Sequence, residues 1–380
     1  MRMQDISTRI DQVLTRAVAE QRVVGAVAWV MRDGGVVHRG AAGLADRETR
    51  RAMTEATPHR FASLTKPITA AAALALVDRG TLALDHQVTR WLPEFRPRFG
   101  DAAPPITIHQ LLTHTSGLGY AFLEPPGGPY HRAEISDGLD QPGLSLADNL
   151  RRLAGAPLRA LPGTEFNYSL SFDVLGAVLE RAADAPLPQV IARHVTQPLD
   201  LADLVFTPRT PGDAAALATP YADGKPPQLI RDGVAVAFAP PLAVSFSPRR
   251  ALDPTSYPSG GAGLLGTAHD FVRFLEALRT RTIPTVSAPL IDAMLRDQIA
   301  PLDSDLLGPG FGQGYGAAVL RDPAAAGSRL QRGAIRWGGA YGHSWFIDPA
   351  TSTTAVLLTN TAFEGMNGAL RGELERAVCR

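Results

Sequence analysis

Hydrophobic and polar residues recur along the chain in blocks that predict strands at both ends and helices between them. Apolar residues spaced three or four positions apart over residues 5–22 predict an amphipathic helix. Two apolar runs then flank residues 32–35, Arg-Asp-Gly-Gly, a pattern typical of a β-hairpin. Short strand-like runs return after residue 315, and a closing helix is expected over about 366–378. The two chain ends are therefore predicted to build one sheet.

The middle of the chain shows mainly helical periodicity. Helices are predicted at 64–79, 107–115, 146–155, 170–183, 187–195 and 268–279. Residues from about 205 to 262 are rich in Pro and Gly, and they predict a long irregular segment of the kind found over functional clefts. We expect an α+β (mixed α/β) protein with helices flanking the sheet. One domain is expected from 1–85 and 285–380, and a mostly helical domain from 86–284.

Composition limits the classes of partner. The chain has 380 residues, of which 45% are hydrophobic and 19% charged, as in soluble globular proteins. Acidic and basic residues balance at 37 each with no basic run, which argues against nucleic-acid and membrane partners. His109 and His114 face different sides of a predicted helix, so no metal or other cofactor is expected. The N-terminus lacks the apolar core of a signal peptide, and a cytoplasmic protein is expected.

A rare lysine marks the first candidate for catalysis. Arginine supplies positive charge throughout, and lysine occurs only at Lys66 and Lys225. Lys225 lies in a polar turn, whereas Lys66 opens an apolar helix three residues after Ser63, on the same helix face. Free N–H groups at a helix start favour negative charge, and burial makes a lysine titratable near neutral pH, which arginine is not. The pair therefore suits a nucleophile and its base. An N-cap serine followed by a lysine whose side chain extends to solvent would give the same spacing.

Two later segments offer partners for this pair. Tyr168 follows a Pro-Gly turn and precedes a helix in LPGTEFNYSLSFDVLGAVLE, and its phenol would shuttle the proton of Ser63. In RWGGAYG, Gly338 and Gly339 would let a substrate lie against the strand, while the N–H groups of Ala340 and Ser63 would form an oxyanion hole. The alternatives are ordinary packing of the tyrosine and a simple bulge at the glycines.

These motifs together resemble a known family. FASLTKPI, PITIHQLLTHTSGLGY, LPGTEFNYSLSFDVLGAVLE, YPSGGAGLLGTAHDF and RWGGAYGHSWFIDPA are similar to segments of the family VIII carboxylesterases, within the class C β-lactamase superfamily. The resemblance implies a β-lactamase-like fold with the active site between a mixed α/β domain and a helical one. It implies Ser63 as nucleophile, Lys66 and Tyr168 as the base system, and hydrolysis of short-chain acyl esters. The implied substrates include acetyl esters, such as the side-chain acetate of cephalosporins.

Departures from the β-lactamase pattern bear on the substrate. Leu170 stands where those enzymes have an asparagine amide, and Trp337 stands where they have a lysine that binds the substrate carboxylate. Both changes predict an apolar contact surface for neutral esters and weak or absent β-lactam cleavage. Arg336 is expected to face the opposite side of its strand from Trp337, so it does not replace the lysine. Tyr120, in an aromatic loop beside the HTSG segment, is a further candidate for substrate contact.

Other functions fit parts of the same pattern. The segment Gly342-His343-Ser344 resembles a nucleophile elbow, but it lacks the final glycine and the helix that should follow. An acyltransferase, or an amide or β-lactam hydrolase, would use the same residues, and product analysis distinguishes them from an esterase. A penicillin-binding module would be acylated without turnover, and it would show a burst without a steady state.

Overall fold

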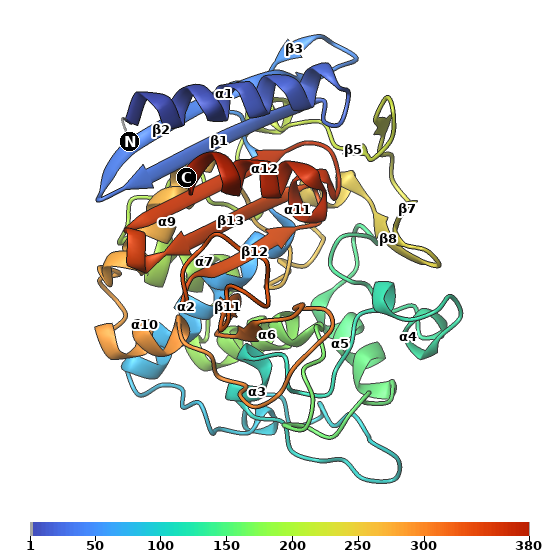
Figure 1. The fold of residues 1–380 in the computed structure, drawn as a ribbon. Coiled ribbons are helices and arrows are strands. Elements are labelled where there is room, and N and C mark those ends of the chain that lie inside the picture. Colours follow the sequence, from blue (N-terminus) through green and yellow to red (C-terminus); the bar gives the residue numbers. More distant parts are fainter. Residues whose placement is uncertain (1–2, 380) are drawn as a thin grey trace.

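The centre of the fold is an eight-stranded antiparallel sheet made by the two ends of the chain (Figure 1). The computed structural model describes residues 3–379. In their order across the sheet the strands are β10 (Phe311–Gln313), β11 (Ala318–Leu320), β12 (Ile335–Gly339), β13 (His343–Asp348), β14 (Thr353–Thr359), β1 (Gly25–Arg32), β2 (Gly35–Asp46) and β3 (Arg51–Ala52). β1 pairs with β14, so strands from opposite ends of the chain are neighbours. This confirms the predicted α+β class and the origin of the sheet.

The predicted hairpin joins β1 and β2. Asp33 and Gly34 both have positive φ, +51° and +78°, as a tight two-residue hairpin turn requires. β1 is buried over its first six residues and β14 along its whole length, because helices cover both faces of the sheet there. α1 (Met3–Ala19) and α12 (Ala369–Val378) lie on one face, and α9 (Ala268–Thr280) packs on β1 and β14 from the other (Figure 1).

The helical part of the chain packs beside this sheet. Its helices are α2 (Thr65–Asp78), α3 (Ile108–Leu112), α4 (Pro129–Arg132), α5 (Leu146–Gly155), α6 (Ser171–Ala183), α7 (Leu187–Ile191), α8 (Pro211–Ala216) and α10 (Ala288–Met294). α7 continues into a π-helical turn, Ala192–Thr196. α2 is buried on all sides over Thr65–Leu76, as its largely apolar sequence predicts. The predicted division into two domains stays a prediction.

Two expected elements differ in the structure. The closing helix is two helices, α11 (Glu364–Asn367) and α12, because Gly368 takes an extended conformation between them. The segment 205–262 is not wholly irregular. It contains the strands β5 (Tyr221–Ala222), β6 (Gln228–Leu229), β7 (Val234–Ala239) and β8 (Leu242–Phe246). β7 and β8 form a hairpin whose alternating residues were obscured by the surrounding prolines and glycines.

Candidate active site

Ser63 lies in a tight turn that leads directly into a buried helix. The turn is a 3₁₀ helix, η1 (Ala62–Leu64), and α2 begins at the next residue. Ala62 is buried with φ of +47°, a left-handed conformation that non-glycine residues rarely adopt and that tends to cluster at functional sites. The Phe61 N–H donates to the Leu264 carbonyl and anchors the incoming chain. The backbone around Ser63 is therefore held in a strained shape.

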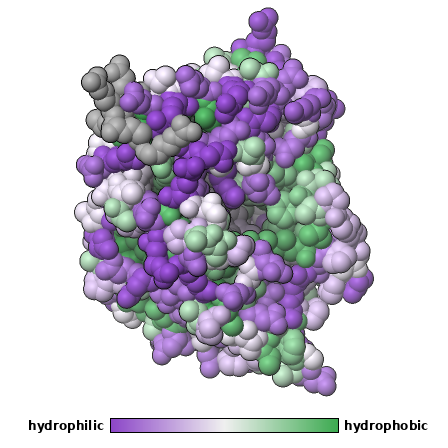
Figure 2. All heavy atoms as spheres, viewed as in Figure 1, coloured by the Kyte–Doolittle hydropathy of each residue, from purple (hydrophilic) through white to green (hydrophobic). Residues whose placement is uncertain are grey.

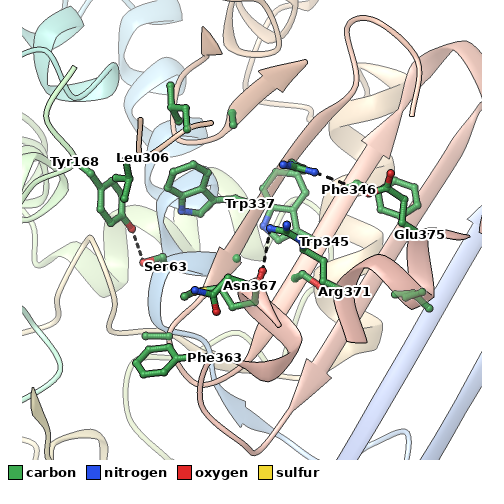
Figure 3. A pocket seen from close by; sticks show the side chains of 18 of the residues that line it. Ser63, Tyr168, Leu306, Trp337, Trp345, Phe346, Phe363, Asn367, Arg371 and Glu375 are labelled. Carbon is green, nitrogen blue, oxygen red and sulfur yellow. Dashed lines mark hydrogen bonds and ion pairs between the residues drawn. The ribbon is translucent and has the colours of Figure 1, made fainter. Parts of the chain in front are cut away.

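The three predicted catalytic groups meet in the structure. The Ser63 and Tyr168 hydroxyl oxygens are 2.6 Å apart (Figure 3). Lys66 Nζ donates to Ser63 Oγ at 3.0 Å and to the Gly261 carbonyl oxygen at 3.0 Å. Only 1% of Lys66 is exposed, so this side chain does not extend to solvent. The simple capping explanation of the Ser63–Lys66 spacing is therefore excluded.

A buried carboxylate, which the sequence reasoning missed, supports the lysine. Asp173 Oδ1 accepts hydrogen bonds from Ser259 Oγ at 2.6 Å and from the Gly261 N–H at 3.3 Å. Gly261 in turn accepts from Lys66, so Asp173 orients the peptide that holds the ammonium. Burial raises the pKa of the Asp173 carboxyl, while the bonds from Ser259 and Gly261 lower it. A clue in the sequence was an acidic residue on the inward face of the helix predicted at 170–183.

Tyr168 packs against a histidine and a tryptophan. The His114 ring centroid lies 4.8 Å from that of Tyr168, and the Trp337 centroid lies 5.3 Å away. Lys66 Nζ stands 4.6 Å from the Tyr168 ring centroid, a cation–π distance. Burial and the nearby Lys66 charge lower the pKa of His114 well below its usual range, so His114 is neutral at neutral pH. His114 therefore serves as a neutral packing partner of the phenol.

The free edge of β12 borders the nucleophile. β11 pairs with β12 at Ile335 and Arg336, so residues 337–339 have no strand partner on that edge. A Cβ atom on Gly339 would stand 2.5 Å from the Phe61 carbonyl oxygen. Glycine is thus required for the strand to lie against the nucleophile turn, more than for access of a substrate. Ala340, directly after β12, lines the same cavity as Ser63.

His343 ties the sheet to the segment before the nucleophile. It is fully buried, Nε2 lies 2.8 Å from the Arg60 carbonyl oxygen, and Nδ1 accepts from the Thr359 N–H at 3.2 Å. These partners require a neutral ring with the proton on Nε2. Burial lowers the pKa of His343 to about 4.

The His343→Gln variant tests this tie through the pH dependence of stability. The folded-state pKa is below the unfolded value of about 6.5, so the unfolded chain binds the proton more readily. The His343 contribution is complete above pH 6.5 and is lost as pH falls toward 4, by roughly 3 kcal/mol. Urea unfolding from pH 7.5 to 4 should show the gap between wild type and variant closing. Parallel curves would contradict the neutral, buried assignment, and all other titrating groups are common to both proteins.

Aromatic side chains from distant segments wall the cavity at Ser63. Phe122, Phe238 of β7 and Phe363 line it, with Phe122 and Phe238 ring centroids 6.3 Å apart. Figure 2 shows hydrophobic residues gathered over the β7–β8 hairpin beside a hollow in this face. The segment 205–262 thus contributes to the cleft, as predicted.

Two predicted substrate contacts have no surface in the cavity. Leu170 is fully buried in the core as the N-cap of α6, and it does not line the cavity. Tyr120 is 2% exposed and stacks behind Phe122 at a centroid distance of 4.7 Å. Phe122, two residues further on, takes the position expected for Tyr120. Trp337 and Gly338 do line the cavity.

Comparison with known proteins places this geometry in a family. The beta-lactamase family profile matches residues 10–380. The chain belongs to the beta-lactamase family. It is 51% identical to Esterase EstB of Burkholderia gladioli over 98% of this chain and 95% of that protein. The solved structure of EstCE1, described as a hydrolase with promiscuous acyltransferase activity, superposes with a TM-score of 0.95 at 42% identity, covering 100% of this chain and 99% of that one.

These relationships settle the class of enzyme. The protein is a serine esterase of the β-lactamase fold, a carboxylic ester hydrolase, and the resemblance to family VIII carboxylesterases is confirmed. Lovastatin esterase of Penicillium rubens is a more distant relative, 28% identical over 78% of this chain and 77% of that protein. The alternative of a penicillin-binding module without turnover is thereby set aside. Within residues 3–379 we find no helix with the length and apolarity to cross a bilayer, and the cellular location stays a prediction.

Proposed function

We propose that the protein hydrolyses short-chain acyl esters, including acetyl esters, through a covalent acyl-Ser63 intermediate. The observation that carries the proposal is the contact of Ser63 Oγ with both the Tyr168 hydroxyl and Lys66 Nζ at the end of an apolar cavity. A serine hydroxyl needs an adjacent base to become a nucleophile, and both neighbours are within reach of its proton.

Acylation begins when Ser63 Oγ attacks the ester carbonyl carbon. Tyr168 reacts as a phenolate, because its own phenolic proton has passed to Lys66, and the Lys66 ammonium stabilises that phenolate. Tyr168 then takes the serine proton and becomes a phenol. Charge on the former carbonyl oxygen is received by the N–H groups of Ser63 and Ala340. The carbon–oxygen bond to the alcohol then breaks, and Tyr168 returns the proton to the departing alkoxide.

Deacylation repeats the sequence with water. A water molecule gives a proton to Tyr168 as its oxygen attacks the acyl carbon, and the same two N–H groups receive the oxyanion. The bond to Ser63 Oγ breaks, Ser63 recovers its proton and the acid leaves. The strained turn at Ala62 and the Gly261 peptide keep the serine and lysine oriented throughout.

The surface near Ser63 supports neutral acyl groups. Trp337 offers an aromatic face where β-lactamases place the lysine that binds the substrate carboxylate, and Phe122 and Phe238 line the same cavity. An anionic β-lactam therefore lacks that partner for its carboxylate. Deacetylation of cephalosporins at their side-chain acetate fits this surface, because the acetyl group that would be transferred to Ser63 is small and neutral.

A cephalosporin with an acetoxymethyl group tests the substrate class directly. We expect chromatography to detect the deacetylated product with the β-lactam ring intact, and p-nitrophenyl acetate and butyrate to be hydrolysed faster than long-chain esters. Ring opening in place of deacetylation would contradict the proposal.

Acyl transfer is a second candidate, favoured by the similarity to EstCE1. The acyl-enzyme would then react with an alcohol in place of water. Product analysis with added benzyl alcohol separates the two outcomes, since transfer yields a benzyl ester and hydrolysis yields only the acid.

A further inference from the structure

The active-site cavity continues well beyond the nucleophile. From Ser63 and Tyr168 it passes Trp337 and extends between β12–β13 and the helices α11 and α12, toward Arg371 and Glu375 (Figure 3). The middle of this extension is apolar, lined by Leu330, Phe346, Ala355 and Leu374. The reaction described above uses only the Ser63 end.

Arg336 lines the far end of this extension, a role that the sequence analysis did not assign to it. Its neighbour Trp337 does face the other side of the strand, as strand geometry requires. The cavity nevertheless reaches both faces, because the 337–339 edge of β12 has no partner strand and Gly338 has no side chain. Sequence reasoning considered one face of the sheet and missed this connection.

The far end holds more positive than negative charge. Arg336 Nη1 lies 3.9 Å from Glu375 Oε2, a loose contact, and its guanidinium stacks 3.9 Å from the Phe311 ring centroid. Arg371 Nη1 donates to the Met366 carbonyl oxygen at 3.1 Å. The charged side chains that line this end are thus two arginines and one glutamate, and of the two arginines only Arg336 contacts the Glu375 carboxylate.

That carboxylate is itself partly committed elsewhere. Glu375 Oε1 accepts from Ser328 Oγ at 2.8 Å and from the Arg329 N–H at 2.9 Å. The other acidic residues of α11 and α12 are Glu364 and Glu373, and both form ion pairs with Arg22. Arg22 Nη1 lies 2.6 Å from Glu364 Oε1, and Arg22 Nη2 lies 3.0 Å from Glu373 Oε2. They are therefore engaged outside the cavity.

Both arginines stay charged in spite of burial. Burial lowers the pKa of Arg336 to about 10 and also lowers the pKa of Arg371. The negative charge of Glu375 acts in the other direction and raises both pKa values, but it only partly offsets the effect of burial. At neutral pH both remain protonated. A partly desolvated cation without a full counter-charge is unfavourable, so an anion entering this end would be stabilised.

We propose that this end of the cavity binds a carboxylate group of the ester substrate, far from the bond that is cleaved. The inference rests on the proposed function and specifies its substrate class: esters with an apolar chain that ends in a carboxylate. Ala340 follows Arg336 by four residues, and at the rise of an extended chain this separation corresponds to about 13 Å. The carboxylate of a β-lactam, close to its reacting bond, would instead meet Trp337.

Rate comparisons on the wild-type enzyme test the proposal at neutral pH. In one arm, p-nitrophenyl half-esters of glutaric, suberic and sebacic acids are compared with p-nitrophenyl alkanoates of equal length. In the other, acetate esters of ω-hydroxyalkanoic acids are compared with acetates of the matching alcohols. For the longer chains we expect kcat/KM to favour the carboxylate by about tenfold to a hundredfold in one arm, the usual effect of a charged hydrogen bond. A preference among the half-esters would show that the acyl group enters the extension, and a preference among the acetates would show that the alcohol group does.

Variants then connect the preference to the arginines. Arg371→Gln should reduce the carboxylate-to-neutral ratio toward one, and Arg371→Lys should retain part of it. Arg376→Gln is the matched control, because Arg376 is exposed on the same helix, and it should leave the ratio unchanged. The wild-type ratio does not depend on any variant folding. Hydrolysis of neutral esters with no carboxylate preference in either arm would overturn this inference and leave the proposed function standing. Hydrolysis of no ester at all would refute the function itself.

Discussion

Replacing Ser63 by alanine is expected to lower kcat for p-nitrophenyl acetate on the order of a millionfold, the effect seen when a serine hydrolase loses its nucleophile. Ser63 Oγ contacts both the Tyr168 hydroxyl and Lys66 Nζ, and no acyl-enzyme can form without it. Spectrophotometric assay of released p-nitrophenol measures the loss. Ser63 is not a core residue, so the variant should unfold at nearly the wild-type temperature.

Ser344→Ala is the matched control for this experiment. Ser344 lines the same cavity and belongs to the segment that resembles a nucleophile elbow, but it lies on β13 with strand residues on both sides. Its removal should leave turnover largely intact. Mass spectrometry after treatment with a p-nitrophenyl phosphonate should locate the adduct on Ser63. Labelling of Ser344, or retained activity in Ser63→Ala, would refute the assignment.

The parts of the site that sequence reasoning could predict depend on local geometry. A separation of three residues places Ser63 and Lys66 on one helix face in any fold, so their contact required only that the helix form. The scarcity of lysine in an arginine-rich chain distinguishes this pair from an ordinary helix start. Tyr168 was found through its Pro-Gly turn and through the family resemblance, because nothing local connects it to Ser63.

The parts that could not be predicted depend on contacts between distant segments. Asp173 acts through Gly261, which lies 88 residues further along the chain. Whether Tyr120 or Phe122 faces the cavity depends on the turn between them, which composition does not determine. The extension toward Arg336 exists because β11 ends early and leaves an edge of β12 open, a property of strand pairing and not of any motif.

The Lys66→Arg variant is expected to lose about a thousandfold in kcat/KM for p-nitrophenyl acetate, within the range for removal of a positioned acid or base. Arginine keeps the positive charge, but its guanidinium does not give up a proton at neutral pH. Its planar fork also cannot replace a single Nζ atom placed 3.0 Å from both Ser63 Oγ and the Gly261 carbonyl oxygen. Lys225→Arg, which changes the other lysine at an exposed turn, is the control and should retain full activity.

Charge and proton transfer can be separated in the Lys66→Ala variant. Methylamine is small enough to occupy the space left by the side chain and can exchange a proton, so it should restore part of the turnover in a concentration-dependent way. Guanidinium carries the same charge but stays protonated, and it should restore little. Equal rescue by both would show that Lys66 contributes only its charge, to the Tyr168 phenolate. Rescue by the amine alone would show that the group at this position also exchanges a proton with Tyr168.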